Sequence, residues 1–257
     1  MRGVIRRHYY LWIHPEYFFD TFWQPVVDVL IWGFITRYFG RANLEMSRLM
    51  SFFLGGVVLF AVLRRGQHEI TFSFMEEAWS RNLQNILMTP VGMGEYFTAS
   101  LLFGLVKLAV ELTLRGSLLG FLFGFNILSL GAALFPFALC LLLTGWMLGL
   151  FVNAAIIYFG RGLIALSWIV VFVLQPFACV FYPVAALPVW AQPFAKAFPA
   201  TWVFEGMRSV LAGDGFSMKM FLVSLGMNLA YLAFAFGVFK WVMRVALDKG
   251  LLTKLEW

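Results

Sequence analysis

The sequence is poor in charged residues. Only 12% of its 257 residues are Asp, Glu, Lys or Arg, whereas soluble domains carry about 25%. Hydrophobic residues make up 62%, so there are too few polar side chains to cover a water-facing surface of this size. This composition excludes a soluble enzyme, a disordered tail and a disulfide scaffold, and it predicts a polytopic membrane protein.

Cysteine and histidine are also scarce. Cys140 and Cys179 both fall in apolar runs, and His8, His14 and His68 are scattered along the chain. No spacing typical of metal ligands results, so we expect no metal site.

Several sequence motifs for chemistry are missing. There is no GxxxxGK[ST] phosphate loop, no GxSxG turn and no HExxH pair, and no histidine neighbours an obvious nucleophile. We therefore expect a protein that is not an enzyme, has no catalytic residues and binds no ATP through such a loop. The net charge of +6 is dispersed, which favours anionic lipid headgroups over nucleic acid as a partner.

Long apolar runs are what the sequence does contain. A helix needs roughly 20 residues to cross a hydrocarbon core of about 30 Å. The runs predict an all-α polytopic membrane protein, with residues 1–257 forming a single transmembrane domain of six helices. The predicted spans cover residues 18–38, 49–75, 95–123, 132–158, 163–181 and 218–242.

The second run allows two interpretations. Its apolar part ends at Arg64, and the sequence turns apolar again before Met75. A span that ends at Arg64 would be short for a crossing, which favours one long helix to about Met75.

Three segments outside the spans have their own patterns. Residues 1–17 are basic and aromatic, which fits an interfacial helix on the cytoplasmic leaflet or a loosely ordered tail. Residues 76–93 place Trp79 and Leu83 on one helical face, and this pattern stops at Thr89-Pro90. Residues 183–208 are interrupted by prolines, which favours short re-entrant helices over a straight crossing.

The distribution of Lys and Arg predicts the orientation. One side of the membrane receives Arg2, Arg6, Arg7, Arg81, Arg161, Lys240, Arg244, Lys249 and Lys254. The other receives Arg41, Arg48, Lys196, Arg208 and Lys219. This bias places both termini and the 76–93 segment in the cytoplasm and the proline-rich segment outside.

Polar side chains recur inside the first three predicted spans at i, i+4 spacing. They are Asp20, Gln24 and Asp28, then Arg64, Arg65, His68 and Glu69, then Lys107, Glu111 and Arg115. A charge at bilayer depth costs about 2.5–3.5 kcal/mol on insertion scales, so such residues normally face the bundle and pair. The spacing predicts the pairs Arg64–His68 and Arg65–Glu69, and an ion-pair network in which Asp28 contacts Lys107. Such a network either locks the helices together or lines a translocation path.

Aromatic residues, 19% of the chain, also have two interpretations. Trp and Tyr near span ends are expected as interface anchors, and a belt facing a lumen could instead stack on sugars or amphiphiles.

Taken in order, these features resemble the permease subunit of a type-2 ABC exporter, the superfamily that includes polysaccharide, nodulation-factor and drug exporters. The resemblance covers essentially the full chain. It rests on the run Asn85-Ile-Leu-Met-Thr89-Pro90-Val91, on the patterns Phe181-Tyr-Pro183, Leu187-Pro188 and Phe198-Pro199, and on the pair Glu205 and Arg208. The cluster at 64–69 departs from the family pattern.

The resemblance implies partners and site residues. Such permeases work as pairs, identical or related, with two separate ATPase subunits that bind ATP and Mg. The 76–93 segment would be the coupling helix, with its docking surface at Glu76, Glu77, Trp79, Arg81, Leu83, Thr89 and Pro90. The external re-entrant segment would include Pro183, Pro188, Trp190, Pro199, Glu205 and Arg208.

We therefore expect an export permease of the bacterial inner membrane that moves a glycan, a lipid-linked substrate or an amphiphile out of the cytoplasm. The alternative is a secondary transporter or channel without an ATPase, which would use Asp28, Lys107 and Glu111 as an ion relay. A membrane assembly factor is a third possibility and an intramembrane enzyme a fourth.

Overall fold

The computed structural model describes residues 10, 12, 15–40, 44–79, 88 and 93–250. Within these ranges every regular element is a helix and no strand occurs, so the predicted all-α class is confirmed. The predicted interfacial helix, 1–17, lies almost entirely outside the described residues. The predicted coupling helix, 76–93, is described at 76–79, 88 and 93 alone.

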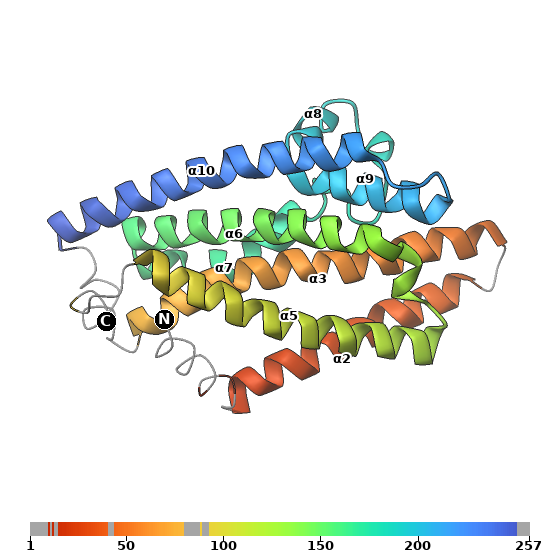
Figure 1. The fold of residues 1–257 in the computed structure, drawn as a ribbon, viewed down its shortest axis with the longest axis horizontal. Helices are drawn as coiled ribbons and strands as arrows, with labels where there is room; N and C mark the ends of the chain where they lie inside the picture. Colours follow the sequence, from red (N-terminus) through yellow and green to blue (C-terminus); the bar gives the residue numbers. More distant parts are fainter. Residues whose placement is uncertain are drawn as a thin grey trace.

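Five helices of the described chain have 26 or more residues and lie lengthwise along the molecule (Figure 1). They are α2 (Pro15–Gly40), α3 (Leu44–Trp79), α5 (Met93–Phe123), α6 (Leu134–Phe159) and α10 (Met218–Asp248). From α2 to α6 successive helices run in opposite directions, as short connections require. The end of α3, the start of α5 and the end of α10 therefore lie at the same end of the bundle.

Helix α3 lies at the centre of this arrangement and α10 lies at its edge. Of the residues in the apolar stretch of α3, 72% are buried inside the protein, whereas 17% of those in the apolar stretch of α10 are buried. Helix α6 packs between them, and its glycines permit close approach to α3. A Cβ atom added to Gly145 would lie 2.7 Å from the backbone nitrogen of Gln67, which is shorter than van der Waals contact.

Three helical segments are long and apolar enough to cross a membrane by length and composition. They are Met50–Glu77, Leu130–Phe159 and Met218–Asp248. Helices α2 and α5 have 26 and 31 residues, but charged residues interrupt their apolar character. The chain is therefore membrane-spanning. Among the described residues, three segments meet these criteria of length and composition.

The second run forms one continuous helix. Helix α3 continues through Arg64 and Arg65 to Trp79, so the shorter interpretation, a span that ends at Arg64, is wrong. The polar residues beyond Arg64 do not face water, because Gln67, Glu69 and Thr71 are buried against neighbouring helices.

The fifth predicted span differs from the structure. The 163–181 region contains only nine α-helical residues, in α7 (Leu166–Leu174), preceded by the 3-10 turn η2 (Arg161–Leu163). At 1.5 Å per residue α7 rises about 14 Å, roughly half of the hydrocarbon core. Pro176 lacks an N–H group and the backbone of Cys179 turns to φ 54°, so the regular helix does not continue.

Short helices gather at the end of the bundle opposite the end of α3 and the start of α5 (Figure 1). They are η3 (Val184–Ala186), α8 (Gln192–Lys196) and α9 (Pro199–Ala212). The 3-10 helix η1 (Ile127–Ala133) makes the turn from α5 into α6. Pro193 and Pro199 lie in the first turns of α8 and α9, where a missing N–H group leaves no hydrogen bond unmade.

Candidate functional site

Five charged residues from α2, α3 and α5 meet inside the bundle, and we call them the charged cluster. They are Asp28, Arg64, Arg65, Glu111 and Arg115. Glu111 and Arg115 are one helical turn apart on α5, and their side chains are fully buried. Two neighbouring arginines of α3 face them across the helix contact.

Glu111 is the acceptor shared by the arginines of the charged cluster. Arg65 Nε donates to Oε2 at 2.7 Å, whereas Arg64 Nη2 and Arg115 Nη2 donate to Oε1 at 3.2 and 2.9 Å. Arg115 Nη2 also donates to Asp28 Oδ2 at 2.9 Å, which connects α2 to the same group. Arg64 Nη2 lies farther from Asp28 Oδ2, at 3.9 Å.

A second ion pair lies one turn before Glu111 along α5. Lys107 Nζ donates to both oxygens of Glu69, at 3.1 and 3.2 Å, and lies 5.0 Å from the centre of the Phe103 ring. The contact predicted between Asp28 and Lys107 is therefore wrong. Helices α3 and α5 run in opposite directions, so residues later in α3 face residues earlier in α5. Glu69 of α3 therefore faces Lys107 of α5.

The predicted pairs within α3 are not formed either. Arg64 and Arg65 both point to Glu111, and Glu69 binds Lys107. His68 instead stacks on Phe72, with the ring centres 4.0 Å apart, and its edge meets Trp168 at 5.1 Å. Its buried Nε2 has no hydrogen-bond partner among the described residues. The cross-helix partner of Glu69, Lys107, donates to both of its carboxylate oxygens.

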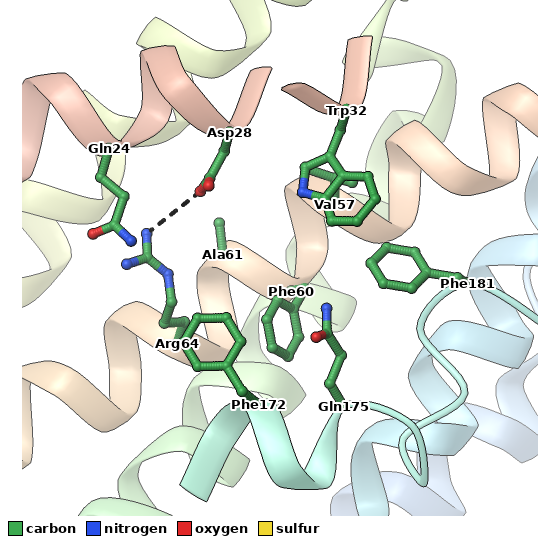
Figure 2. Close-up of a pocket in the computed structure, with 10 residues that line it drawn as sticks. All are labelled: Gln24, Asp28, Trp32, Val57, Phe60, Ala61, Arg64, Phe172, Gln175 and Phe181. Carbon is green, nitrogen blue, oxygen red and sulfur yellow. Dashed lines mark ion pairs between the residues drawn. The ribbon is translucent and has the colours of Figure 1, made fainter. Parts of the chain in front are cut away.

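A cavity of about 170 Å³ borders the charged cluster (Figure 2). Its lining comes from α2, α3, α7 and the turn that follows α7: Gln24, Asp28, Trp32, Val57, Phe60, Ala61, Arg64, Phe172, Gln175 and Phe181. In Figure 2 the side chains of Gln24, Asp28 and Arg64 converge at one end, and Trp32 and Phe181 lie at the other. The cavity is therefore polar at one end and aromatic at the other.

Aromatic stacking builds the apolar end. Phe53 and Phe181 stack with ring centres 4.4 Å apart, and Trp32 lies 5.2 Å from Phe53 and 5.3 Å from Phe181. These rings come from three separate segments, α3, α2 and the turn after α7. The three side chains are partly buried; Trp32 and Phe181 line the cavity, and Phe53 packs against both of them without lining it.

Sequence reasoning located Gln24, Asp28 and Arg64 but missed the other half of the cavity. Gln175 is an amide in an otherwise apolar run, which is the same signal that identified Gln24. Trp32, Phe172 and Phe181 carry no comparable signal, because aromatic residues are common throughout this chain. Asp20 lies in α2, and its side chain is outside the described set.

Carbonyl groups in the turn that follows α7 accept hydrogen bonds from side chains later in the chain. Tyr182 Oη donates to the carbonyl of Pro176 at 2.8 Å, Thr201 Oγ1 to that of Phe177 at 3.2 Å, and Arg208 Nη1 to that of Cys179 at 2.9 Å. Burial raises the pKa of the Tyr182 phenol, with a further contribution from Cys179, so the phenol remains a donor at neutral pH. A helix end inside the protein thus avoids unsatisfied polar groups.

Glu205 and Arg208 hold the predicted re-entrant segment together. Glu205 Oε1 accepts a hydrogen bond from the backbone N–H of Val184 at 2.7 Å and forms an ion pair with Arg208 Nη2 at 3.1 Å. Pro183 and Pro188 accept backbone hydrogen bonds that close the turns at η3 and before α8. Trp190 is 69% exposed and contributes nothing to this core.

Most of the residues predicted to dock an ATPase lie outside the residues that the structure describes. Arg81, Leu83, Thr89 and Pro90 lie outside the described residues, and Trp79 is the last residue of α3. Glu76 is partly exposed and Glu77 is buried, and both lie within α3. The predicted boundary at residue 76 falls inside α3, which continues to Trp79, and the docking role of these residues stays a prediction.

Comparison with protein families gives one match. The model described as ABC-2 type transporter matches residues 4–212, which extend to the end of α9. Among individually curated proteins none matches this chain.

Proposed function

Because the chain belongs to the ABC-2 type transporter family, we propose that it is the membrane-spanning permease subunit of an ATP-driven exporter. Membership in this family implies association with ABC ATPase partners. The family match over 209 of 257 residues (212 − 4 + 1) carries this proposal. The lack of a phosphate loop in the sequence supports it, because ATP and Mg would then bind to the partner subunits.

The proposed complex contains two ATPases and a second permease, either another copy of this chain or a paralogue. It resides in the bacterial inner membrane with both termini in the cytoplasm. Its substrate would be a glycan, a lipid-linked molecule or an amphiphile. The chain itself would catalyse no covalent reaction.

The arrangement of the helices supports a mechanism for coupling. The end of α3 and the start of α5 lie at the opposite end of the bundle from α8 and α9 (Figure 1). If ATPases bind the segment that joins these two helices, their closure moves the end of α3 and the start of α5 together. ATP can shift the permease from one state to the other only if it binds more tightly to one of the two states.

The charged cluster supports the transmission of this motion. It joins α2, α3 and α5 through buried ion pairs, and removal of one partner from such a pair costs about 3–5 kcal/mol. The three helices therefore move as one body when the end of α3 is displaced. The cavity beside the cluster would change shape with them, because α7 forms its other wall.

The test is an Arg81→Ala substitution in the full-length chain, studied with the ATPase that co-purifies with it. We expect the affinity of the two proteins to fall by about tenfold, since an interface arginine contributes more than about 1 kcal/mol. Transport per ATP hydrolysed should fall, whereas the thermal unfolding midpoint of the permease should not.

Arg244→Ala is the matched control, because Arg244 is an exposed arginine about one turn before the end of α10, and α10 ends at the same end of the bundle as α3 (Figure 1). Equal effects of the two substitutions would contradict the docking assignment. Purification of an active transporter without any ATPase would contradict the whole proposal and favour secondary transport through the intramembrane charges.

A further inference from the structure

The geometry points to a binding site for a single uncharged sugar ring in the cavity between α2, α3 and α7. This inference rests on the proposed function, since it names the chemical class of group that the permease would bind. Four observations support it: the opposite charges that line the cavity, the two amide side chains in its walls, the neighbouring aromatic rings and the volume of the cavity.

The two charged side chains that line the polar end have opposite signs. Arg64 Nη2 lies 3.9 Å from Asp28 Oδ2, and each group also has an ion-pair partner outside the cavity lining: Arg115 at 2.9 Å from Asp28 and Glu111 at 3.2 Å from Arg64. An anionic ligand would therefore lie beside the Asp28 carboxylate, and a cationic ligand beside the Arg64 guanidinium. Because like charges repel at such a site, the cavity favours a neutral ligand.

Two amide side chains on opposite walls offer hydrogen bonds. Gln24 on α2 and Gln175 after α7 both line the cavity, and neither side chain makes a hydrogen bond to another described residue. Each amide provides two N–H donors and a carbonyl acceptor. Neighbouring hydroxyl groups, which both donate and accept, match this set, whereas a simple alkyl chain would leave the amides without partners.

The aromatic end provides flat apolar surfaces. Trp32 and Phe181 lie 5.3 Å apart on one side, and Phe60 and Phe172 lie 6.3 Å apart on another (Figure 2). The C–H face of a sugar ring packs against such surfaces while hydroxyl groups at its edge point to Gln24 at the polar end and to Gln175, which lies beside Phe60 (Figure 2). One ring can therefore satisfy both ends at the same time.

The volume limits the ligand to about one ring. At about 30 Å³ per liquid water molecule, 170 Å³ corresponds to roughly half a dozen waters. Pockets for drug-sized ligands measure about 300–1,000 Å³, so a large multi-ring molecule does not fit. Phe172, at the edge, is 51% exposed, so a chain attached to the ring can extend outward there.

The test measures equilibrium binding of tritiated hexyl β-glucoside to the full-length chain in phosphatidylcholine nanodiscs, with empty nanodiscs subtracted. No ATP or ATPase is present, so failure here leaves the coupling test of the proposed function unaffected. We expect saturable binding. Unlabelled hexyl phosphate, hexyltrimethylammonium and 1-hexanol, which have the same alkyl chain, should not compete.

Substitutions in the cavity should weaken this binding. We expect Gln175→Leu and Gln24→Leu each to raise the Kd by about three- to tenfold, the loss of one neutral hydrogen bond. Phe172→Leu should have a similar effect, whereas Phe234→Leu, an exposed phenylalanine of α10 outside the cavity, should have none. Because the amides lie on different segments, one variant remains informative if the other fails to fold.

Four results would overturn the inference. They are the absence of saturable glucoside binding, equal competition by either charged compound, equal competition by hexanol, and unchanged binding in all three cavity variants. The charged compounds would identify an ionic site, hexanol would identify a site for the alkyl chain alone, and unaffected variants would place the glucoside elsewhere.

Discussion

At the scale of single residues, Glu111 is the shared partner of arginines from two helices. It accepts hydrogen bonds from Arg64 and Arg65 of α3 and from Arg115 of its own helix, and its side chain is fully buried. A buried carboxylate in this position compensates guanidinium groups that cannot lose their charge. The energy of the whole cluster therefore depends on this one side chain.

We predict that Glu111→Gln destabilises the protein by about 3–5 kcal/mol, because it leaves buried arginines without their shared counter-charge. Thermal unfolding of the purified chain in nanodiscs measures the effect. Glu95→Gln, an exposed glutamate at the start of the same helix, is the control and should change little. Equal stability of Glu111→Gln and the unsubstituted chain would show that the cluster is not a stabilising element.

Cys179 has a backbone conformation that side chains disfavour. Its φ is 54°, and Arg208 holds its carbonyl at 2.9 Å. A non-glycine residue in the left-handed region costs about 1–2 kcal/mol relative to ordinary conformations. Glycine does not pay this cost, because it has no Cβ atom.

We predict that Cys179→Gly is more stable than Cys179→Ala by about 1 kcal/mol, since only the glycine relieves the backbone. Both substitutions remove the buried thiol, so comparing the two unfolding midpoints isolates the effect of φ. In a regular helix the order is the reverse. An alanine variant that is the more stable of the two would argue against the left-handed turn.

At the scale of elements, the contact between α3 and α6 depends on small residues. A Cβ atom at Gly145 would meet the carbonyl of Leu63 and the nitrogen of Gln67, and one at Gly149 would lie 2.7 Å from the Cβ atom of Ile70. Small residues allow the backbones of membrane helices to approach closely, and van der Waals packing then stabilises the pair.

We predict that Gly145→Ala lowers the free energy of unfolding by about 1–3 kcal/mol, because the added methyl group must push the two backbones apart. Gly226→Ala in α10 is the matched control, since nothing lies within 4 Å of its added Cβ atom. The control should be neutral or stabilising by up to about 1 kcal/mol, as alanine favours a helix. Denaturation of both variants in nanodiscs checks the sign, and a tolerated Gly145→Ala would contradict the close contact.

At the scale of the whole molecule, the two ends of the bundle differ in chemistry. Lys240, Arg244 and Lys249 lie toward the end where α3 finishes, and the short helices η3 and α8 lie at the opposite end. Basic residues collect on the cytoplasmic side of membrane proteins, which favours the orientation proposed above.

We predict that Trp190→Cys reacts with a membrane-impermeant maleimide in intact cells, whereas Lys249→Cys reacts only after permeabilisation. Both positions are exposed, and the native Cys140 and Cys179 are fully buried, so background labelling should be low. Mass spectrometry of the labelled protein distinguishes the sites. The opposite labelling pattern would invert the orientation and place the α3–α5 segment outside the cell.

The amino-acid sequence by itself determined the membrane class and the helical character of this protein. Both follow from local quantities: scarce charge, apolar runs longer than a bilayer crossing, and prolines that interrupt 183–208. The same local signals identified Gln24, Asp28, Arg64 and Glu111 as polar groups in apolar surroundings. They could not identify partners, because helical spacing describes one helix at a time.

Only the tertiary structure decided which residues meet. Antiparallel packing pairs Glu69 with Lys107 and Arg65 with Glu111, and this register depends on where α3 and α5 cross. The turn that follows α7 likewise depends on distant side chains, since Thr201 and Arg208 donate to the carbonyls of Phe177 and Cys179. The cavity combines residues more than 150 positions apart, from Gln24 to Phe181, so it exists only once three segments have packed together.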